Sequence, residues 1–129
     1  MKTVFSPLHN RRTATTELDG GVLIAPHEKP SRAETIRGRV KQEQLGDVLP
    51  PDDFGLEPNL RVHTPDYVNF LQTCWKDWEA EDKPGEAIPA VWPGRGMRER
   101  VPKDIDGRLG YYSFAAETSI TEGTWDAAC

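Results

Sequence analysis

The sequence lacks the patterns that define several common classes of protein. Its 129 residues include only two cysteines, Cys74 and Cys129, which predicts neither a disulfide framework nor a zinc knuckle. There is no long apolar run, and the N-terminus is not signal-like. Acidic residues outnumber basic ones, 21 to 16, which argues against a phosphate-binding surface. We therefore expect a cytoplasmic protein that binds neither nucleic acid nor membranes.

The sequence also lacks a recognisable catalytic or metal-binding motif. Its three histidines, His9, His27 and His63, are far apart, and none belongs to a pair with metal-ligand spacing. There is no glycine-rich phosphate loop and no GxSxG motif. Asp104 and Asp106 form a lone DxD, a pattern that helps to hold hard cations but more often is a solvated turn. From its own residues, then, the chain shows no complete active site.

Regular structure is expected to be sparse. The chain has 11 glycines, 11 prolines and 36% hydrophobic residues, and its mean hydropathy is −0.65. This composition and length predict a soluble, loop-rich chain of at most one domain with a modest core.

The clearest element is a helix that starts at Pro65. Thr64 suits the N-cap, where its hydroxyl would accept from a first-turn amide, and Pro65 suits the next position. Six apolar residues then recur at spacings of three and four, which places them on one face. They are Tyr67, Phe70, Leu71, Cys74, Trp75 and Trp78. This stripe predicts a core helix rather than a ligand site, and His63 before it suits a structural hydrogen bond.

Weaker signals predict the elements before this helix. Residues 2–5 suit a short strand, and Gly20-Gly21 suits a turn. A capping-box pattern of Ser31 and Glu34 predicts a helix over about 31–44, which Gly46 would end.

Residues 79–109 form a long segment without a helical or strand period. Roughly 30 such residues exceed the usual connections within a domain, so we expect this loop to be functional or to meet a partner. Its apolar residues favour burial against another surface, whereas its basic residues favour a solvated face. The apolar residues are Ile88, Val91, Trp92 and Met97, and the basic ones are Arg95, Arg98, Arg100 and Lys103.

The C-terminal residues read as the start of a helix. Thr124 suits the cap, Asp126 suits the first turn, and alanines follow. A helix of little more than one turn is not stable alone, so we expect the chain to be a truncated part of a longer one.

Taken together, the chain resembles the N-terminal third of acetylpolyamine amidohydrolases, a branch of the histone deacetylase superfamily. The resemblance runs along the whole chain with almost unbroken spacing. It is carried by Thr16-Glu17-Leu18, Gly20-Gly21, the 26–34 stretch with Pro30 and Arg32-Ala33-Glu34, Phe54-Gly55-Leu56-Glu57, Val62-His63, Tyr67, Asn69-Phe70-Leu71, Trp75, Trp78, Gly85-Glu86-Ala87-Ile88, Ile105-Asp106-Gly107, Gly110-Tyr111-Tyr112, Ala115-Ala116-Glu117-Thr118 and Gly123-Thr124-Trp125.

The resemblance implies an α/β fold: the N-terminal part of a three-layer arginase/deacetylase domain with a mainly parallel sheet, incomplete in residues 1–129. It also implies a zinc-dependent hydrolase that removes the acetyl group of acetylated polyamines or related acetyl-amines. The zinc ligands and catalytic residues of the family lie beyond the end of this chain, so no catalytic or metal-binding residue is assigned here. We expect the chain alone to bind no zinc, to be inactive and to fold poorly, because further strands would be needed to cover Phe70, Trp75 and Trp78.

The resemblance assigns roles to a few residues of this chain. Glu117 and Asp106 match acidic substrate determinants of the family, although Asp106 stands where the family more often has Glu. A cap or a surface charge is the other interpretation of Glu117. The 79–109 loop matches an insertion that packs across a homodimer and narrows the active-site entrance. Arg32 matches a residue of the interior behind the site, with a structural ion pair as the alternative, and His27 stands where Phe is common.

Two other functions remain open at this point. The chain would be a non-catalytic oligomerisation or binding module if no catalytic part followed it. A related deacetylase would act on acetyl-lysine or another small amide instead of an acetylpolyamine.

Overall fold

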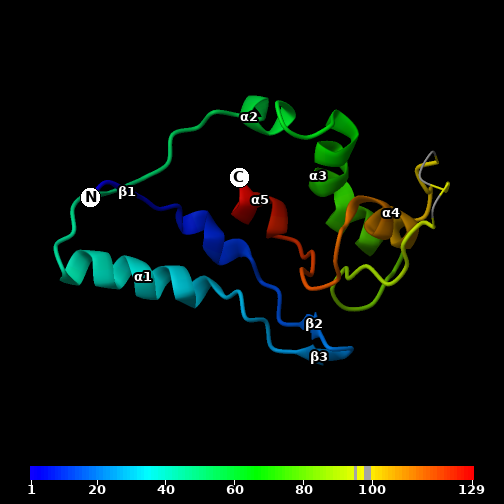
Figure 1. The fold of residues 1–129 in the computed structure, drawn as a ribbon, viewed down its shortest axis with the longest axis horizontal. Helices are drawn as coiled ribbons and strands as arrows, with labels where there is room; N and C mark the ends of the chain where they lie inside the picture. Colours follow the sequence, from blue (N-terminus) through cyan, green and yellow to red (C-terminus); the bar gives the residue numbers. More distant parts are fainter. Residues whose placement is uncertain (95, 98–99) are drawn as a thin grey trace.

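Ten short elements make up the computed structural model, which describes residues 1–94, 96–97 and 100–129. In chain order they are β1 (Thr3–Val4), the 3-10 helix η1 (Pro7–Arg11), β2 (Glu17–Asp19), β3 (Val22–Ile24), α1 (Pro30–Gln42), β4 (Val48–Leu49), α2 (Glu57–Leu60), α3 (Pro65–Ala80), α4 (Ile105–Tyr112) and α5 (Thr124–Ala128). Figure 1 shows them around an open frame, with α1 and β1 at one end, α3 and α4 at the other, and η1 beside α5 between them.

The strands form two small sheets. β1 pairs in parallel with β4, with Thr3 opposite Val48, and α1 lies in the connection between them. A connection of this kind is what parallel strands require, and the pair agrees with the parallel sheet that the sequence predicts. β2 and β3 form an antiparallel hairpin that turns at Gly20 and Gly21. Both glycines have positive φ, 56° and 83°, which glycine adopts without strain.

Helix α3 begins at Pro65 as predicted, but its cap differs. The carbonyl of Thr64 accepts from the amide of Val68 at 3.1 Å, whereas the Thr64 side chain makes no capping hydrogen bond. The hydroxyl is instead bonded to the carboxylate of Asp66, and this bond, together with one from Tyr112, lowers the pKa of Asp66. A carboxylate is the stronger partner for a hydroxyl donor, which is why the predicted side-chain cap is wrong.

The apolar stripe of α3 forms the core together with α4 and two segments from the loops. The buried members of this core are Phe70, Cys74, Trp78, Ala87, Ile105, Leu109 and Ile120. Tyr112 of α4 stacks on Phe70, with ring centroids 4.6 Å apart, and Arg108 pairs with Asp77 at 2.7 Å. The expectation that other strands are needed to cover Phe70 and Trp78 is therefore wrong. Trp75 remains half-buried.

The long segment 79–109 contains more regular structure than predicted. Helix α3 continues to Ala80, and α4 begins at Ile105, so the irregular part is confined to the described residues of 81–94, 96–97 and 100–104. The amide of Asp106 donates to Asp104 at 2.9 Å, which caps α4. Gly110 lies so close to the loop that a β-carbon there would be 1.5 Å from the carbonyl oxygen of Val91. Glycine weakens the helical signal in the sequence, but this packing requires it.

Two other predicted helix starts are also wrong in detail. The N-cap of α1 is Lys29, without a side-chain bond, and Pro30 takes the first helical position. Ser31 therefore lies inside the helix, and Glu34 pairs with Arg37 at 2.6 Å instead of closing a capping box. The N-cap of α5 is Gly123 rather than Thr124. The hydroxyl of Thr124 accepts from the amide of Thr121 at 2.8 Å, so it stabilises the preceding turn.

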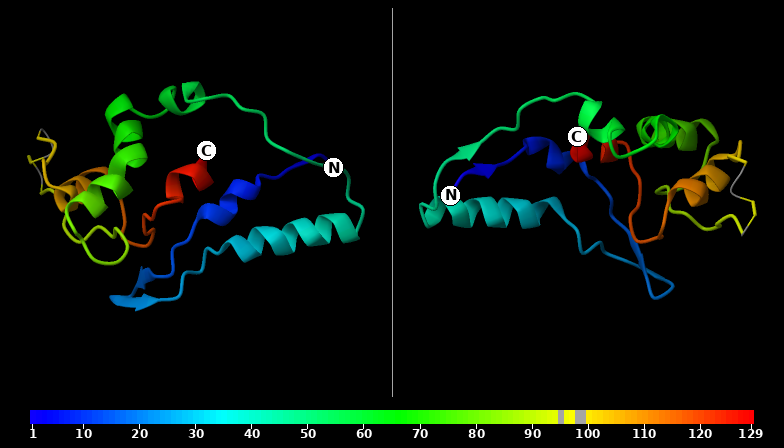
Figure 2. Two further views of the ribbon diagram at one scale, coloured as in Figure 1. Left: turned by 180° about the vertical axis from the view of Figure 1, so that it is seen from behind. Right: turned by 45° about the horizontal axis from the view of Figure 1, so that its top comes forward.

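The frame leaves much of its surface exposed. The accessible area is 9229 Å², whereas a compact protein of 14.5 kDa exposes about 6,900 Å². Large apolar side chains contribute to the difference, among them Phe114, which is fully exposed, and Val62 at 79%. Figure 2 shows from two further sides that α1 lies apart from the lobe of α3 and α4. No helix among the described residues is long and apolar enough to span a membrane.

Candidate functional site

Asp106, one of the two acidic residues that the sequence singles out, lies in the first turn of α4. Its carboxylate contacts the ammonium group of Lys83, which comes from the turn after α3. Glu81 approaches the same ammonium at 3.8 Å and also accepts from the amide of Ile105 at 3.3 Å. The hydrogen bond to Asp106 raises the pKa of Lys83. Asp106 therefore already holds a cation of its own chain.

Glu117, the other predicted acid, is exposed in the segment between α4 and α5. The residues on either side of this position are anchored, since Ala116, Ser119 and Ile120 are buried. The hydroxyl of Ser119 donates to the carbonyl of Thr16 at 2.6 Å, and Ile120 pairs with Ala87. Among the described residues Glu117 has no ion-pair partner. A carboxylate on an anchored loop and without a partner is free to bind a cation.

A third carboxylate, Glu86, has a structural role that the sequence does not reveal. Its two oxygens accept from the amides and hydroxyls of Thr15 and Thr16, at 2.5 to 3.3 Å. Burial acts to raise the pKa of Glu86, but these hydrogen bonds outweigh it and lower the pKa to about 2. Glu86 thus connects Thr15 and Thr16 to its neighbour Ala87, which pairs with Ile120 of the segment that carries Glu117.

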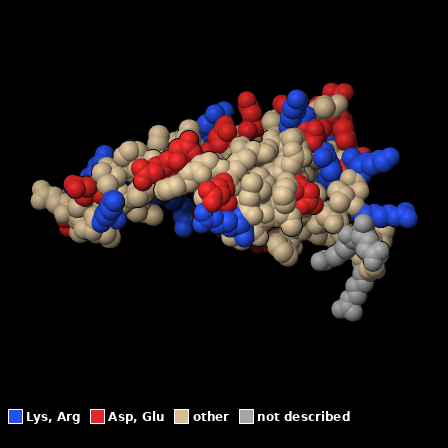
Figure 3. Space-filling view, turned by 90° about the horizontal axis from the view of Figure 1, so that it is seen from above, with Lys and Arg blue, Asp and Glu red and all other residues tan. Residues whose placement is uncertain are grey.

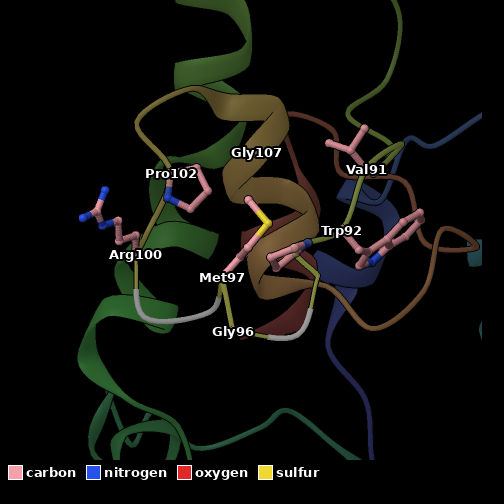
Figure 4. A pocket seen from close by; sticks show the side chains of 8 residues that line it. Val91, Trp92, Gly96, Met97, Arg100, Pro102 and Gly107 are labelled. Atoms are coloured by element: carbon pink, nitrogen blue, oxygen red, sulfur yellow. The ribbon is translucent and has the colours of Figure 1, made fainter.

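An apolar hollow of about 710 Å³ lies between the irregular segment and α4. Its lining residues are Val91, Trp92, Pro93, Gly96, Met97, Arg100, Pro102 and Gly107. Figure 4 shows Met97 lying against α4 near Gly107, while Arg100 points away. Trp92 donates to the carbonyl of Ser113 at 3.0 Å, which ties the hollow to the start of the Glu117 segment. Of the predicted basic run, Arg95 and Arg98 fall outside the described residues.

The histidines do not gather into a metal site. His9 bonds through Nδ1 to the carbonyl of Ser6 at 2.6 Å, and the ring of His63 lies 5.1 Å from that of Tyr67. His27 is exposed, and only its backbone amide bonds, to Glu17. Across residues 1–94, 96–97 and 100–129, no three His, Cys, Asp or Glu side chains converge on a point. The side chains described here therefore do not fit a zinc site.

The contacts of the two remaining candidates, Arg32 and Cys74, indicate structural rather than catalytic roles. Arg32 is exposed and pairs with Glu28 one turn earlier, which agrees with the ion-pair interpretation. Cys74 is fully buried, and burial raises the pKa of its thiol to about 12, so it is not a nucleophile at neutral pH. On the face seen in Figure 3, acidic and basic side chains are interspersed.

Comparison with known proteins gives matches along nearly the whole chain. An acetylpolyamine amidohydrolase of Mycoplana ramosa is 48% identical over 128 residues, which are 99% of this chain and 38% of that protein. Acetylpolyamine amidohydrolase 2 of Pseudomonas aeruginosa is 48% identical over 127 residues, 98% of this chain and 37% of that protein. The crystal structure of an acetylpolyamine aminohydrolase from Burkholderia pseudomallei superposes with a TM-score of 0.86 at 27% identity, covering 99% of this chain and 37% of the other. No protein-family model matches.

In sequence and in fold, nearly the whole chain is similar to proteins of one class, the amidohydrolases. Within that class, its similarity is to one part of the acetylpolyamine amidohydrolases, which confirms the resemblance predicted from the sequence. The chain spans less than two fifths of the length of these relatives, 37% to 38%. The predicted fold, an incomplete α/β deacetylase fold, is likewise confirmed.

Proposed function

We propose that residues 1–129 are the N-terminal part of a single larger domain, and that the whole protein is a zinc-dependent amidohydrolase. It hydrolyses the acetyl amide of acetylated polyamines or related acetyl-amines, so that water and the amide give acetate and a free amine. The observation that carries this proposal is 48% identity to acetylpolyamine amidohydrolases over nearly the whole chain. In this proposal the zinc ligands lie outside residues 1–129, as the resemblance to these amidohydrolases implies.

In this proposal the present chain contributes to recognition of the cationic substrate. Glu117 is exposed and free, so it is the first candidate to bind an ammonium group that remains on the acetylated amine. Two unit charges 4 Å apart attract by roughly 1 kcal/mol in water and by roughly 4 kcal/mol near a protein surface. Asp106 is the second candidate, and it contributes less because it has a shorter side chain than Glu and already contacts Lys83.

We also propose that the segment 79–109 mediates homodimerisation and narrows the entrance to the active site. Its exposed apolar residues Val91, Trp92 and Met97, together with the apolar hollow beside α4, support a protein partner rather than solvent. The partners of the whole protein are thus a cationic acetyl-amine and a second copy of itself. A cytoplasmic location, without nucleic-acid partners, stays a prediction from composition and charge.

The proposal is tested by steady-state kinetics of the full-length, zinc-supplied protein. We expect N-acetylputrescine to be hydrolysed with a higher kcat/KM than an acetyl-lysine peptide. Glu117→Gln should raise KM for N-acetylputrescine about threefold or more, and should leave turnover of N-acetylbutylamine, which has no second amine, unchanged. Glu122→Gln, which changes another exposed glutamate five residues later, is the control.

Preference for the acetyl-lysine peptide would favour the alternative deacetylase. Hydrolysis of no acetyl-amine would favour a binding module. An equal effect of Glu117→Gln on the charged and the uncharged substrate would remove Glu117 from ammonium binding.

A further inference from the structure

The parallel pair of β1 and β4 has two outer edges, and the directions of its hydrogen bonds distinguish them. The amide of Thr3 donates to the carbonyl of Asp47 at 3.0 Å. The amide of Phe5 donates to the carbonyl of Leu49 at 2.9 Å. Because successive residues of a strand point their backbone groups to opposite sides, the amide and carbonyl of Val4 point away from β4. In the described part of the chain, β4 is the only strand that pairs with β1.

The outer edge of β4 is less suited to a further strand than that of β1. Val48 lies between the two carbonyls that accept from β1, so its own amide and carbonyl point outward. The next outward position is Pro50, which has no amide hydrogen, and Pro51 follows it. Proline within a sheet is found mainly on edge strands. On β1, by contrast, the outward residues Lys2 and Val4 both have amide hydrogens.

The two faces of this pair are also unequal. Helix α1 covers the face that bears Phe5, since the guanidinium carbon of Arg37 lies 4.4 Å from the centroid of that ring. The opposite face bears Val4, which is 60% exposed, and its register partner Leu49, which is 37% exposed. Parallel strands are usually covered on both faces and belong to larger sheets. The pair therefore lacks a cover on one face as well as a neighbour at the edge of β1.

We propose that the outer edge of β1 receives a further parallel strand from the part of the whole protein outside residues 1–129. β1 is then an inner strand, and β4 is the edge strand of the sheet. The proposal rests on the function proposed above only in that these residues belong to a larger domain. The relatives are long enough to supply the strand and a cover for Val4 and Leu49, because this chain covers only 37% to 38% of their length.

A second copy of the chain is the other occupant to consider for this edge. Two identical edges related by a two-fold axis form an isologous contact, which aligns the two copies of β1 antiparallel. Such a contact would extend the sheet but would leave Val4 and Leu49 exposed on their face. A strand from the same domain, with the helix that connects parallel strands, satisfies both the edge and the face.

The test is hydrogen exchange of backbone amides in the full-length protein, resolved to single residues. Val4 and Val48 are matched probes, because the amide of each points out of the pair of β1 and β4. We expect the amide of Val4 to exchange about 100-fold or more slowly than that of Val48. Equal exchange at the two positions, or slower exchange at Val48, would overturn the proposal.

Two proline variants test the same edge by stability. Val4→Pro removes the amide that would bond to the further strand, and should raise the unfolding equilibrium constant of the full-length protein about 100-fold or more. Val48→Pro removes the outward amide of the proposed edge strand, and should raise this constant about tenfold or less. Val4→Ala keeps the amide and measures the loss of the side chain alone. Equal effects of the two prolines would contradict the proposal, and if Val4→Pro does not fold, hydrogen exchange of the wild type still decides.

Further outcomes separate the two occupants and the proposed function. Slow exchange at Val4 that is lost when the protein is diluted to a monomer would assign the edge to a second copy and overturn the proposal. Hydrolysis of N-acetylputrescine with fast exchange at Val4 would leave the proposed function standing and refute the further strand. Slow exchange at Val4 in a monomer that hydrolyses no acetyl-amine would support the strand and refute the proposed activity.

Discussion

At the scale of single residues, Glu86 shows how a carboxylate joins distant parts of the chain. It accepts hydrogen bonds from Thr15 and Thr16, which are about seventy positions away in sequence. Next to it, Ala87 pairs with Ile120, so the same two residues connect the N-terminal segment to the loop that carries Glu117. The position of the candidate substrate-binding acid thus depends on a residue outside its own loop.

The low pKa of Glu86 predicts how the free energy of unfolding depends on pH. Its pKa is lowered from 4.5 to about 2 in the folded state, so its contribution is complete above about pH 5 and is lost as the pH falls toward 2. At pH 7, Glu86→Gln should lower the free energy of unfolding by about 1–3 kcal/mol, because charged hydrogen bonds are lost. Denaturant unfolding of the full-length protein at pH 7, 5 and 3 measures the difference.

The difference between wild type and Glu86→Gln should be similar at pH 7 and 5 and smaller at pH 3. Glu79→Gln, which changes an exposed glutamate of α3, should have little effect at any of these values. A difference that stays constant down to pH 3 would contradict the low pKa of Glu86.

At the scale of elements, α3 and α4 show which local signals can be interpreted from the sequence and which cannot. Thr64 and Pro65 mark the start of α3, and the spacing from Tyr67 to Trp78 identifies its buried face, because both signals are local. Helix α4 is not predicted from the sequence, because Gly107 and Gly110 lower its helical propensity. The reason for Gly110, the carbonyl of Val91, comes from the preceding loop and is visible only in the fold.

The candidate site, too, could be predicted only in part from the sequence. Similarity to a family selects Asp106 and Glu117, and the structure places them on α4 and on the loop after it. The partner of Asp106, Lys83, is 23 positions away, and no spacing rule connects the two. Ser31 and Glu34 match the capping-box pattern but do not form a capping box, since Pro30 starts the helix one residue earlier.

We predict that a charged substitution in the segment between α3 and α4 weakens the proposed homodimer. Met97 is 66% exposed and lines the hollow beside α4, so it is well placed to pack on a second copy. If Met97 lies in the homodimer contact proposed above, Met97→Asp should raise the dimer dissociation constant of the full-length protein by about tenfold or more, since a charge would be buried without a partner. Sedimentation equilibrium measures this constant.

Met97→Leu keeps the apolar area and should retain the dimer. Equal dissociation constants for Met97→Asp and wild type would contradict the proposed dimer contact at Met97.

At the scale of the whole molecule, the chain combines one well-packed core with a wide exposed frame. The lobe of α3 and α4 buries Phe70 and Trp78 with its own residues, whereas Phe54 and Val62 are 70% and 79% exposed. The open frame shown in Figures 1 and 2 suits a chain that spans 37% to 38% of its relatives. The proposed rest of the domain would cover these apolar side chains and supply the metal site.

The most direct test of this account is acetate release from N-acetylputrescine, measured for the full-length protein and for residues 1–129 alone at the same zinc concentration. We predict release by the full-length protein and none by residues 1–129. Release by residues 1–129 alone, or by neither protein, would contradict the account.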